Sequence, residues 1–158
     1  MNAKKIYNLE LEETLEEVNL IALHSSMECY QLAFYLNNTI NSNFKRSKND
    51  LSIKDAKNNF IHFEWEDEMY DFQCSLFSNK CHDELKPKKL IPNNLFNLPV
   101  RNEVYLSPEL KQVDFFIKSS DQKTIETVLL NLKKWSKISL LYQVDSEVIK
   151  KQLNVIFD

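Results

Sequence analysis

The sequence predicts an α+β fold in which a mostly antiparallel sheet carries two main helices packed on one face. Several short runs alternate apolar and polar side chains, as half-buried strands do. Two longer segments instead repeat apolar residues with the period of a helix. The 158 residues, 43% of them apolar and 27% charged, have the size and composition of a single globular domain spanning residues 1–158.

The first part of the chain predicts two strands and a helix. Residues 5–11 alternate apolar and polar side chains and predict a half-buried strand. Residues 18–24 are apolar on both faces and predict a central strand. Ser25 and Ser26 then predict the N-cap of a helix over about residues 27–41.

A weak strand is expected at residues 51–53, followed by a hairpin formed by residues 58–66 and 69–77. One face of the hairpin is expected to be apolar and carries Ile61, Phe63, Trp65, Tyr70, Phe72, Cys74 and Leu76. The other face is expected to point outward and carries His62, Gln73 and a candidate acidic face of Glu64, Glu66 and Asp71. Such a face is typical of a solubilising surface, because exposed carboxylates lack the desolvation that separates an acid from a base.

Residues 79–106 hold three of the four prolines and show no clear period, so we interpret them as an irregular proline-containing connection. The last third predicts a strand at 113–118, a helix at 121–137 and a strand at 140–144, which together form a β-α-β unit. Ser146 is expected to cap a final short helix before an edge strand. One topology that fits is ferredoxin-like, with two β-α-β units flanking a hairpin.

The chain contains no glycine. Phosphate-binding loops, the dinucleotide-binding fingerprint and the nucleophile elbow of hydrolases all need glycine in a tight turn or beside a ligand, so these classes are excluded. Left-handed backbone positions are expected to fall to Asn or Asp. A backbone of this kind favours action through the outer surface over enclosure of a small anionic ligand.

Three cysteines, an odd number, indicate free thiols and hence a cytoplasmic localisation, and no apolar run approaches the length of a membrane span. The spacing of Cys74, Cys81 and His82 differs from that of structural zinc sites. Cys29 lies on the apolar stripe of the first helix, where a buried thiol is expected. We therefore assign no catalytic, cofactor-binding or metal-binding residue, and enzyme activity stays open.

The first helix carries a second apolar stripe opposite its core stripe, formed by Met27, Tyr30 and Phe34. Either the 79–106 connection or the C-terminal segment covers these side chains, or they form a docking patch for a partner.

The net charge of −3 gives no global field that would attract nucleic acid. Lysines at 80, 86, 88 and 89 keep RNA contact open as an alternative, although the aromatic hairpin strands carry acid rather than base.

Residues 107–115 read SPELKQVDF, a segment that resembles the signature of the IPExxxVDY family of uncharacterised bacterial proteins. The matching residues, with their spacing intact, are Pro108, Glu109, Val113 and Asp114. Ser107 and Phe115 stand where the signature has Ile and Tyr. The apolar strand followed by HSSMECYQLAFYLNN, the acidic aromatic hairpin and the ending NVIF extend the resemblance over nearly the whole chain. The resemblance implies no activity, cofactor or catalytic residue.

The motif also has a physical interpretation. Ser107 as N-cap and Pro108 at the first helical position predict a short helical turn. Asp114 is expected to accept backbone N–H bonds from the neighbouring loop and so to fix the turn to the following strand. The alternative is that Glu109 and Asp114 form a recognition or chemical site.

These observations predict a non-enzymatic cytoplasmic adaptor or regulatory module that docks to another protein. An RNA-associated accessory factor and a cryptic enzyme are the alternatives.

Overall fold

A computed structural model describes residues 19–52, 58–84 and 101–144, with backbone alone at 82–84 and 101–102. The strand predicted at residues 5–11, and the helix and strand predicted after Ser146, lie outside the described residues.

The elements, in chain order, are β1 (Asn19–Ser25), α1 (Cys29–Thr39), β2 (Lys45–Arg46), β3 (Leu51–Ser52), β4 (Asn59–Phe60), β5 (His62–Asp67), β6 (Phe72–Ser78), β7 (Lys80–Glu84), β8 (Arg101–Tyr105), the 3-10 turn η1 (Pro108–Leu110), β9 (Phe115–Ser119), α2 (Gln122–Lys133) and β10 (Ile138–Val144).

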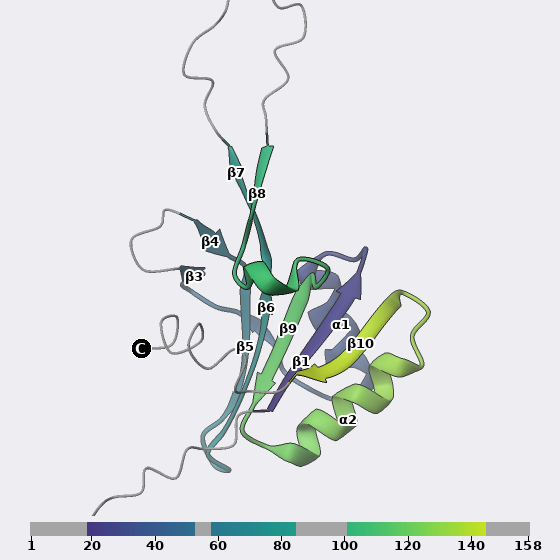
Figure 1. Cartoon of the computed structure of the whole chain (residues 1–158). Helices are drawn as coiled ribbons and strands as arrows, with labels where there is room; N and C mark the ends of the chain where they lie inside the picture. Colours follow the sequence, from purple (N-terminus) through teal and green to yellow (C-terminus); the bar gives the residue numbers. More distant parts are fainter. Residues whose placement is uncertain (1–18, 53–57, 85–100, 145–158) are drawn as a thin grey trace, which may run out of the picture.

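The main sheet has six strands in the order β10-β1-β9-β6-β5-β2, and every neighbouring pair is antiparallel (Figure 1). Two-stranded pairs β3-β4 and β7-β8 stand beside it. Strand β1 lies between β9 and β10, so the β9-α2-β10 unit straddles a third strand. After β1 and α1 the chain passes through β2 to β5 before it reaches β6 on the far side of β9, which leaves β10-β1-β9-β6 as neighbours in that order. This is the ferredoxin-like order, widened at one edge by β5 and β2. The predicted α+β class with a mostly antiparallel sheet is confirmed.

Both helices pack on one face of the sheet and share one core with it. That core contains Ile21 and Leu23 of β1, and Ile125, Val128 and Leu132 of α2. The rings of Tyr35 on α1 and Trp135, just after α2, stack at 3.7 Å with an interplanar angle of 5°. The apolar period of the second helix therefore predicted its buried stripe correctly.

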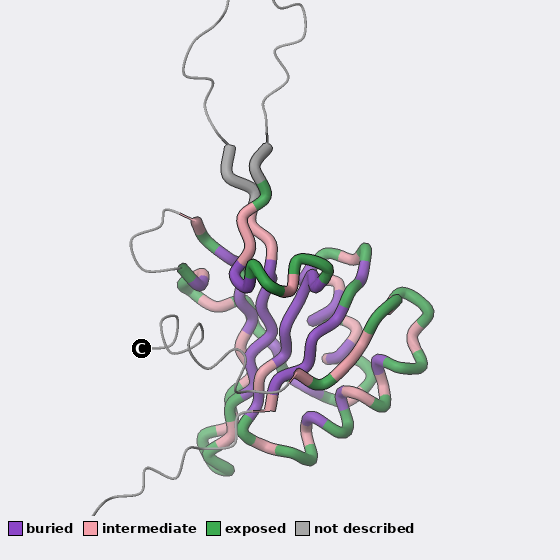
Figure 2. Tube along the Cα trace, viewed as in Figure 1, coloured by how far each residue is buried: buried purple, intermediate pink, exposed green. Residues whose placement is uncertain are grey.

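A second core covers the opposite face of the sheet. Phe77 of β6 and Phe116 of β9 are buried there against Phe60 of β4. For this reason His62, which was expected to point outward, is 4% exposed and lies edge-on to Phe77. The prediction for His62 was wrong because the alternation of β5 does not reveal that both faces of the sheet are covered. Figure 2 shows the resulting buried centre of the sheet.

Burial of His62 makes stability depend on pH. Burial lowers the pKa of His62 below its ordinary value, although Glu64 at 3.4 Å opposes the shift. In the unfolded chain the imidazole takes up its proton near pH 6.5, whereas the folded protein resists protonation until lower pH. Neutral His62 therefore makes its full contribution to the free energy of unfolding above about pH 6.5, and this contribution is lost as the pH falls from there through the pKa of His62 in the folded protein. We expect urea unfolding of His62→Gln to show a weaker decline in stability than the wild type between about pH 7.5 and pH 5; equal declines would contradict this.

Local corrections concern the ends of elements. The N-cap of α1 is Glu28, whose backbone N–H donates to the side-chain oxygen of Gln31 in a capping box. The hydroxyl oxygen of Ser25 accepts a bond from the backbone N–H of Met27, which precedes the helix. Ser25 and Ser26 are therefore not the cap. Ile61 and Tyr70 lie outside β5 and β6 and are 39% and 76% exposed, so they do not belong to the apolar face of the hairpin.

The stretch 79–106 is not irregular at its ends. Strands β7 and β8 pair there, with Lys80 opposite Tyr105 and Cys81 opposite Val104. The ribbon rises from one end of the sheet (Figure 1). At its base, Cys81 of β7 and Val104 of β8 are partly buried against the second core. The described residues with left-handed backbone are Asn41 and Asp71, as expected for a glycine-free chain.

Candidate functional site

The carboxylate of Asp114, just before β9, contacts three donor groups on strands β1 and β7. Its Oδ2 accepts from Ser25 N–H at 3.0 Å and contacts His24 Nδ1, both at the end of β1. Its Oδ1 lies 2.7 Å from Lys80 Nζ at the start of β7. The bond to Asp114 raises the pKa of Lys80, so the ammonium stays charged. The motif at residues 107–115 thus places a buried carboxylate just before β9, beside β1 and β7.

Asn79, between β6 and β7, completes this region and is fully buried. Its Nδ2 donates to the carbonyl oxygens of Leu110 at 2.9 Å and Val113 at 2.8 Å, and its Oδ1 accepts from Ser107 N–H at 2.8 Å. Its backbone N–H donates to the carbonyl of Asp114 at 2.8 Å. We call Asn79 and Asp114 with these partners the Asn79–Asp114 junction; it joins the base of the ribbon to η1 and β9.

The junction has the donors of a structural anchor rather than the parts of a catalytic centre. A carboxylate beside an imidazole can orient a general base, but a nucleophile must then face that base. The hydroxyl of Ser25 instead donates to the carbonyl of Lys137 at 2.9 Å. Among the residues that the structure describes, no group of three or more His, Cys, Asp or Glu side chains is arranged to hold a metal ion.

The predicted helical turn is confirmed as η1, with Pro108 at its first position and Ser107 as N-cap. Asp114 accepts a backbone N–H bond, but from Ser25 on β1 and not from the neighbouring loop as expected. Glu109 is exposed, so the structure does not bring it into the junction. Sequence reasoning missed Asn79, His24 and Lys80, since single polar residues at strand ends carry no pattern.

The outer face of α1 exposes aromatic rings. Tyr30 is 61% exposed and Phe34 is 70% exposed, while Met27 before the helix is half-buried. The helix from Cys29 to Thr39 contains no charged residue. We call Tyr30 and Phe34, with Met27 at their margin, the α1 aromatic face.

The residues of the candidate acidic face line two grooves, and Glu66 lies in both. Glu64 lies opposite Lys45 of β2 in the strand register, and Glu66 accepts a bond from Gln73 Nε2 at 3.3 Å. Asp71 lies in the turn before β6, with φ 48°. Glu66 and Asp71 share an open groove of about 270 Å³, which Glu64 does not line.

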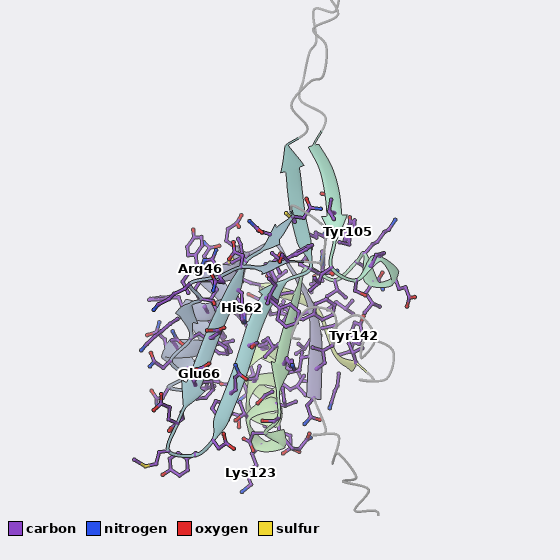
Figure 3. All side chains as sticks on the ribbon, turned by 90° about the vertical axis from the view of Figure 1, so that its left-hand side faces the viewer. Arg46, His62, Glu66, Tyr105, Lys123 and Tyr142 are labelled. Atoms are coloured by element: carbon purple, nitrogen blue, oxygen red, sulfur yellow. The ribbon has the colours of Figure 1, made fainter. Side chains whose placement is uncertain are left out.

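Basic side chains lie next to this acid, which the sequence analysis missed. A groove of about 600 Å³ is lined by Lys45, Arg46 and Lys48 together with Glu64 and other acidic residues. Figure 3 shows Arg46 and Glu66 along the same edge of the sheet. Basic residues thus accompany Glu64 and Glu66 in this groove, whereas, among the described residues, the groove that Glu66 shares with Asp71 is lined by acidic and no basic residues.

The cysteines of the core are unreactive. Burial raises the pKa of Cys29 and that of Cys74 to about 12, so both remain thiols at neutral pH. Cys81 on β7 is partly exposed.

Comparison with family models, with curated proteins and with solved structures found no match to this chain. Within the described ranges, no helix has the length and apolar character needed to cross a membrane.

Proposed function

We propose that this protein is a non-enzymatic cytoplasmic adaptor or regulatory module that binds another protein through the α1 aromatic face. One observation carries the proposal: a helix that shows Tyr30 and Phe34 to solvent has no charged residue along its whole length. Interface cores are depleted in charge and enriched in aromatic side chains, whereas ordinary surface helices are not.

Helix α2 provides the internal comparison. It packs on the same face of the sheet, and its exposed side carries Lys123, Glu126 and Lys133 around an exposed Leu130. A helix that only shields the core therefore has a charged outer side in this chain. The uncharged outer side of α1 supports a role beyond shielding.

The chemistry of the face fits an apolar partner surface. Tyr30 and Phe34 are four residues apart and form a ridge along the helix, which suits the groove between apolar side chains of a second helix. We therefore expect the partner to present the apolar stripe of an amphipathic helix.

The double substitution Tyr30→Ala/Phe34→Ala tests the proposal. A photo-reactive phenylalanine analogue at position 34 would first identify the protein that is crosslinked in native cells. We expect the double variant to weaken binding of that purified partner about tenfold or more, because exposed aromatic anchors dominate interface energies. Its melting temperature should stay close to that of the wild type.

Leu130→Ala on α2 is the matched control, since Leu130 is 60% exposed on the neighbouring helix; it should bind normally. A large loss of stability in the double variant would assign the rings to the core. Crosslinks to RNA alone would favour the RNA-associated alternative, and normal binding by the double variant would refute the proposed face.

We also propose, from the match at Pro108, Glu109, Val113 and Asp114, that the chain is related to the IPExxxVDY family. The contacts of Asp114 support this because they explain why a carboxylate follows the turn at that spacing. A crystal structure of a protein with the complete signature should show the same turn and a carboxylate bonded to the backbone of the first central strand.

A further inference from the structure

Strand β10 forms one edge of the six-stranded sheet. Within the described part of the chain it pairs only with β1, from Leu20 opposite Val144 to His24 opposite Leu140. In an antiparallel edge strand, alternate backbone N–H and C=O groups point away from the single neighbour. Such a row is a template for another strand unless the protein blocks it.

The two edges of the sheet differ in how they are protected. At the opposite edge, β2 is only two residues long, and both Lys45 and Arg46 are exposed and charged. Short and charged edge strands prevent pairing with other chains. Strand β10 is seven residues long and contains no charged residue. Figure 2 shows it as partly exposed beside the buried β1.

The side chains of β10 have a symmetric pattern. Read in either direction from Leu141, the order of apolar and polar residues is the same. The corresponding positions are Leu140 and Tyr142, Ser139 and Gln143, and Ile138 and Val144. An antiparallel strand of identical sequence, centred on Leu141, therefore places apolar residues opposite apolar ones and polar residues opposite polar ones.

We propose that β10 pairs with β10 of a second copy of this chain, so that two six-stranded sheets join across a two-fold axis. The pairing is isologous, as required for a closed dimer. Leu140, now 41% exposed, would face Tyr142 of the other copy. The register between β1 and β10 shifts at His24 and Ser25, so the regular part of the edge is Leu140–Val144.

The absence of charge decides in favour of a second copy over a charged peptide. A strand that pairs with itself around Leu141 brings the side chains at positions 140, 141 and 142 near their own equivalents, so a charge at this centre would meet a like charge. Leu140, Leu141 and Tyr142 carry no charge. Because stable interfaces usually bury about 1,200–2,000 Å², and one strand pair covers less, we expect a dimer that dissociates on dilution.

This inference is independent of the docking proposal, because it uses the sheet edge and not the α1 aromatic face. Sedimentation velocity of the full chain between about 5 and 500 μM would measure the dimer directly. We expect the wild type to shift from monomer to dimer over this range. Leu140→Lys and Leu140→Glu should each remain monomeric, because the two substituted side chains lie diagonally across the axis within reach of each other.

An equimolar mixture of the two variants should restore the dimer, since lysine then meets glutamate. Tyr142→Lys is a second variant in case substitution at Leu140 impairs folding, which circular dichroism would reveal, because the two side chains at position 142 also lie diagonally across the axis. Lys45→Glu on β2 is the matched control and should dimerise normally. Tyr30→Ala/Phe34→Ala should also dimerise.

A wild type that stays monomeric throughout would overturn the inference. So would folded Leu140→Lys and Tyr142→Lys variants that still dimerise. Loss of the dimer in the double variant of the α1 aromatic face would instead place the dimer interface on α1.

Discussion

Asn79→Ala is expected to lower the free energy of unfolding by about 3–5 kcal/mol. The substitution leaves three backbone groups without the amide, namely the carbonyls of Leu110 and Val113 and the N–H of Ser107. Asn79 is fully buried, so water cannot replace these bonds without opening the structure. Urea unfolding followed by circular dichroism would measure the effect.

Two variants make this test specific. Asn79→Asp keeps the acceptor for Ser107 but turns the second polar atom into an acceptor that faces two carbonyl oxygens, so it should destabilise at least as strongly as alanine. Asn38→Ala removes an exposed amide that donates only to Phe34 O one helical turn away, and it should change stability by less than about 0.5 kcal/mol. Similar results for Asn38→Ala and Asn79→Ala would contradict the role of the junction.

Asp114→Ala is expected to cost about 1–3 kcal/mol, because the buried N–H of Ser25 loses its acceptor. The other two partners, Lys80 and His24, are partly exposed and can be solvated, so their loss adds little. Asp114→Asn should cost less, because its remaining oxygen can still accept one of these donors. Thermal and urea unfolding would both detect the losses.

Glu109→Gln is the control from the same motif, since Glu109 is exposed; it should leave stability within about 0.5 kcal/mol. If Asp114→Asn left stability unchanged while a binding activity disappeared, the carboxylate would belong to a recognition site instead.

The amphipathic parts of the fold were predictable because their side chains report which face is buried. The helical period predicted α2, and the apolar character of both faces predicted that β1 lies inside the sheet. The β7-β8 ribbon was not predicted because Cys81 and Val104, which pack against the second core, are too few to form an apolar period. The burial of His62 was not predicted because the strand that covers it, β4, is only two residues long and belongs to a separate two-stranded pair.

The candidate site was predictable only in part. The motif identified Asp114 as an acceptor of backbone bonds, yet its donor on β1 is 89 residues away in the sequence. Asn79 looks in the sequence like any polar residue between strands, and only its bonds to residues 106–114, far along the chain, make it important. Exposure of Tyr30 and Phe34 was one of two readings, because a second apolar stripe does not show whether it is covered.

The junction also determines how movement of the ribbon would propagate. Lys80 at the ribbon's base binds Asp114, which binds the backbone of Ser25, whose hydroxyl reaches the carbonyl of Lys137 just before β10. The same hydroxyl accepts from Met27 N–H at the approach to α1. A ligand that displaced the ribbon would therefore displace the start of α1 and the start of β10 as well, because a direct chain of hydrogen bonds connects all three elements.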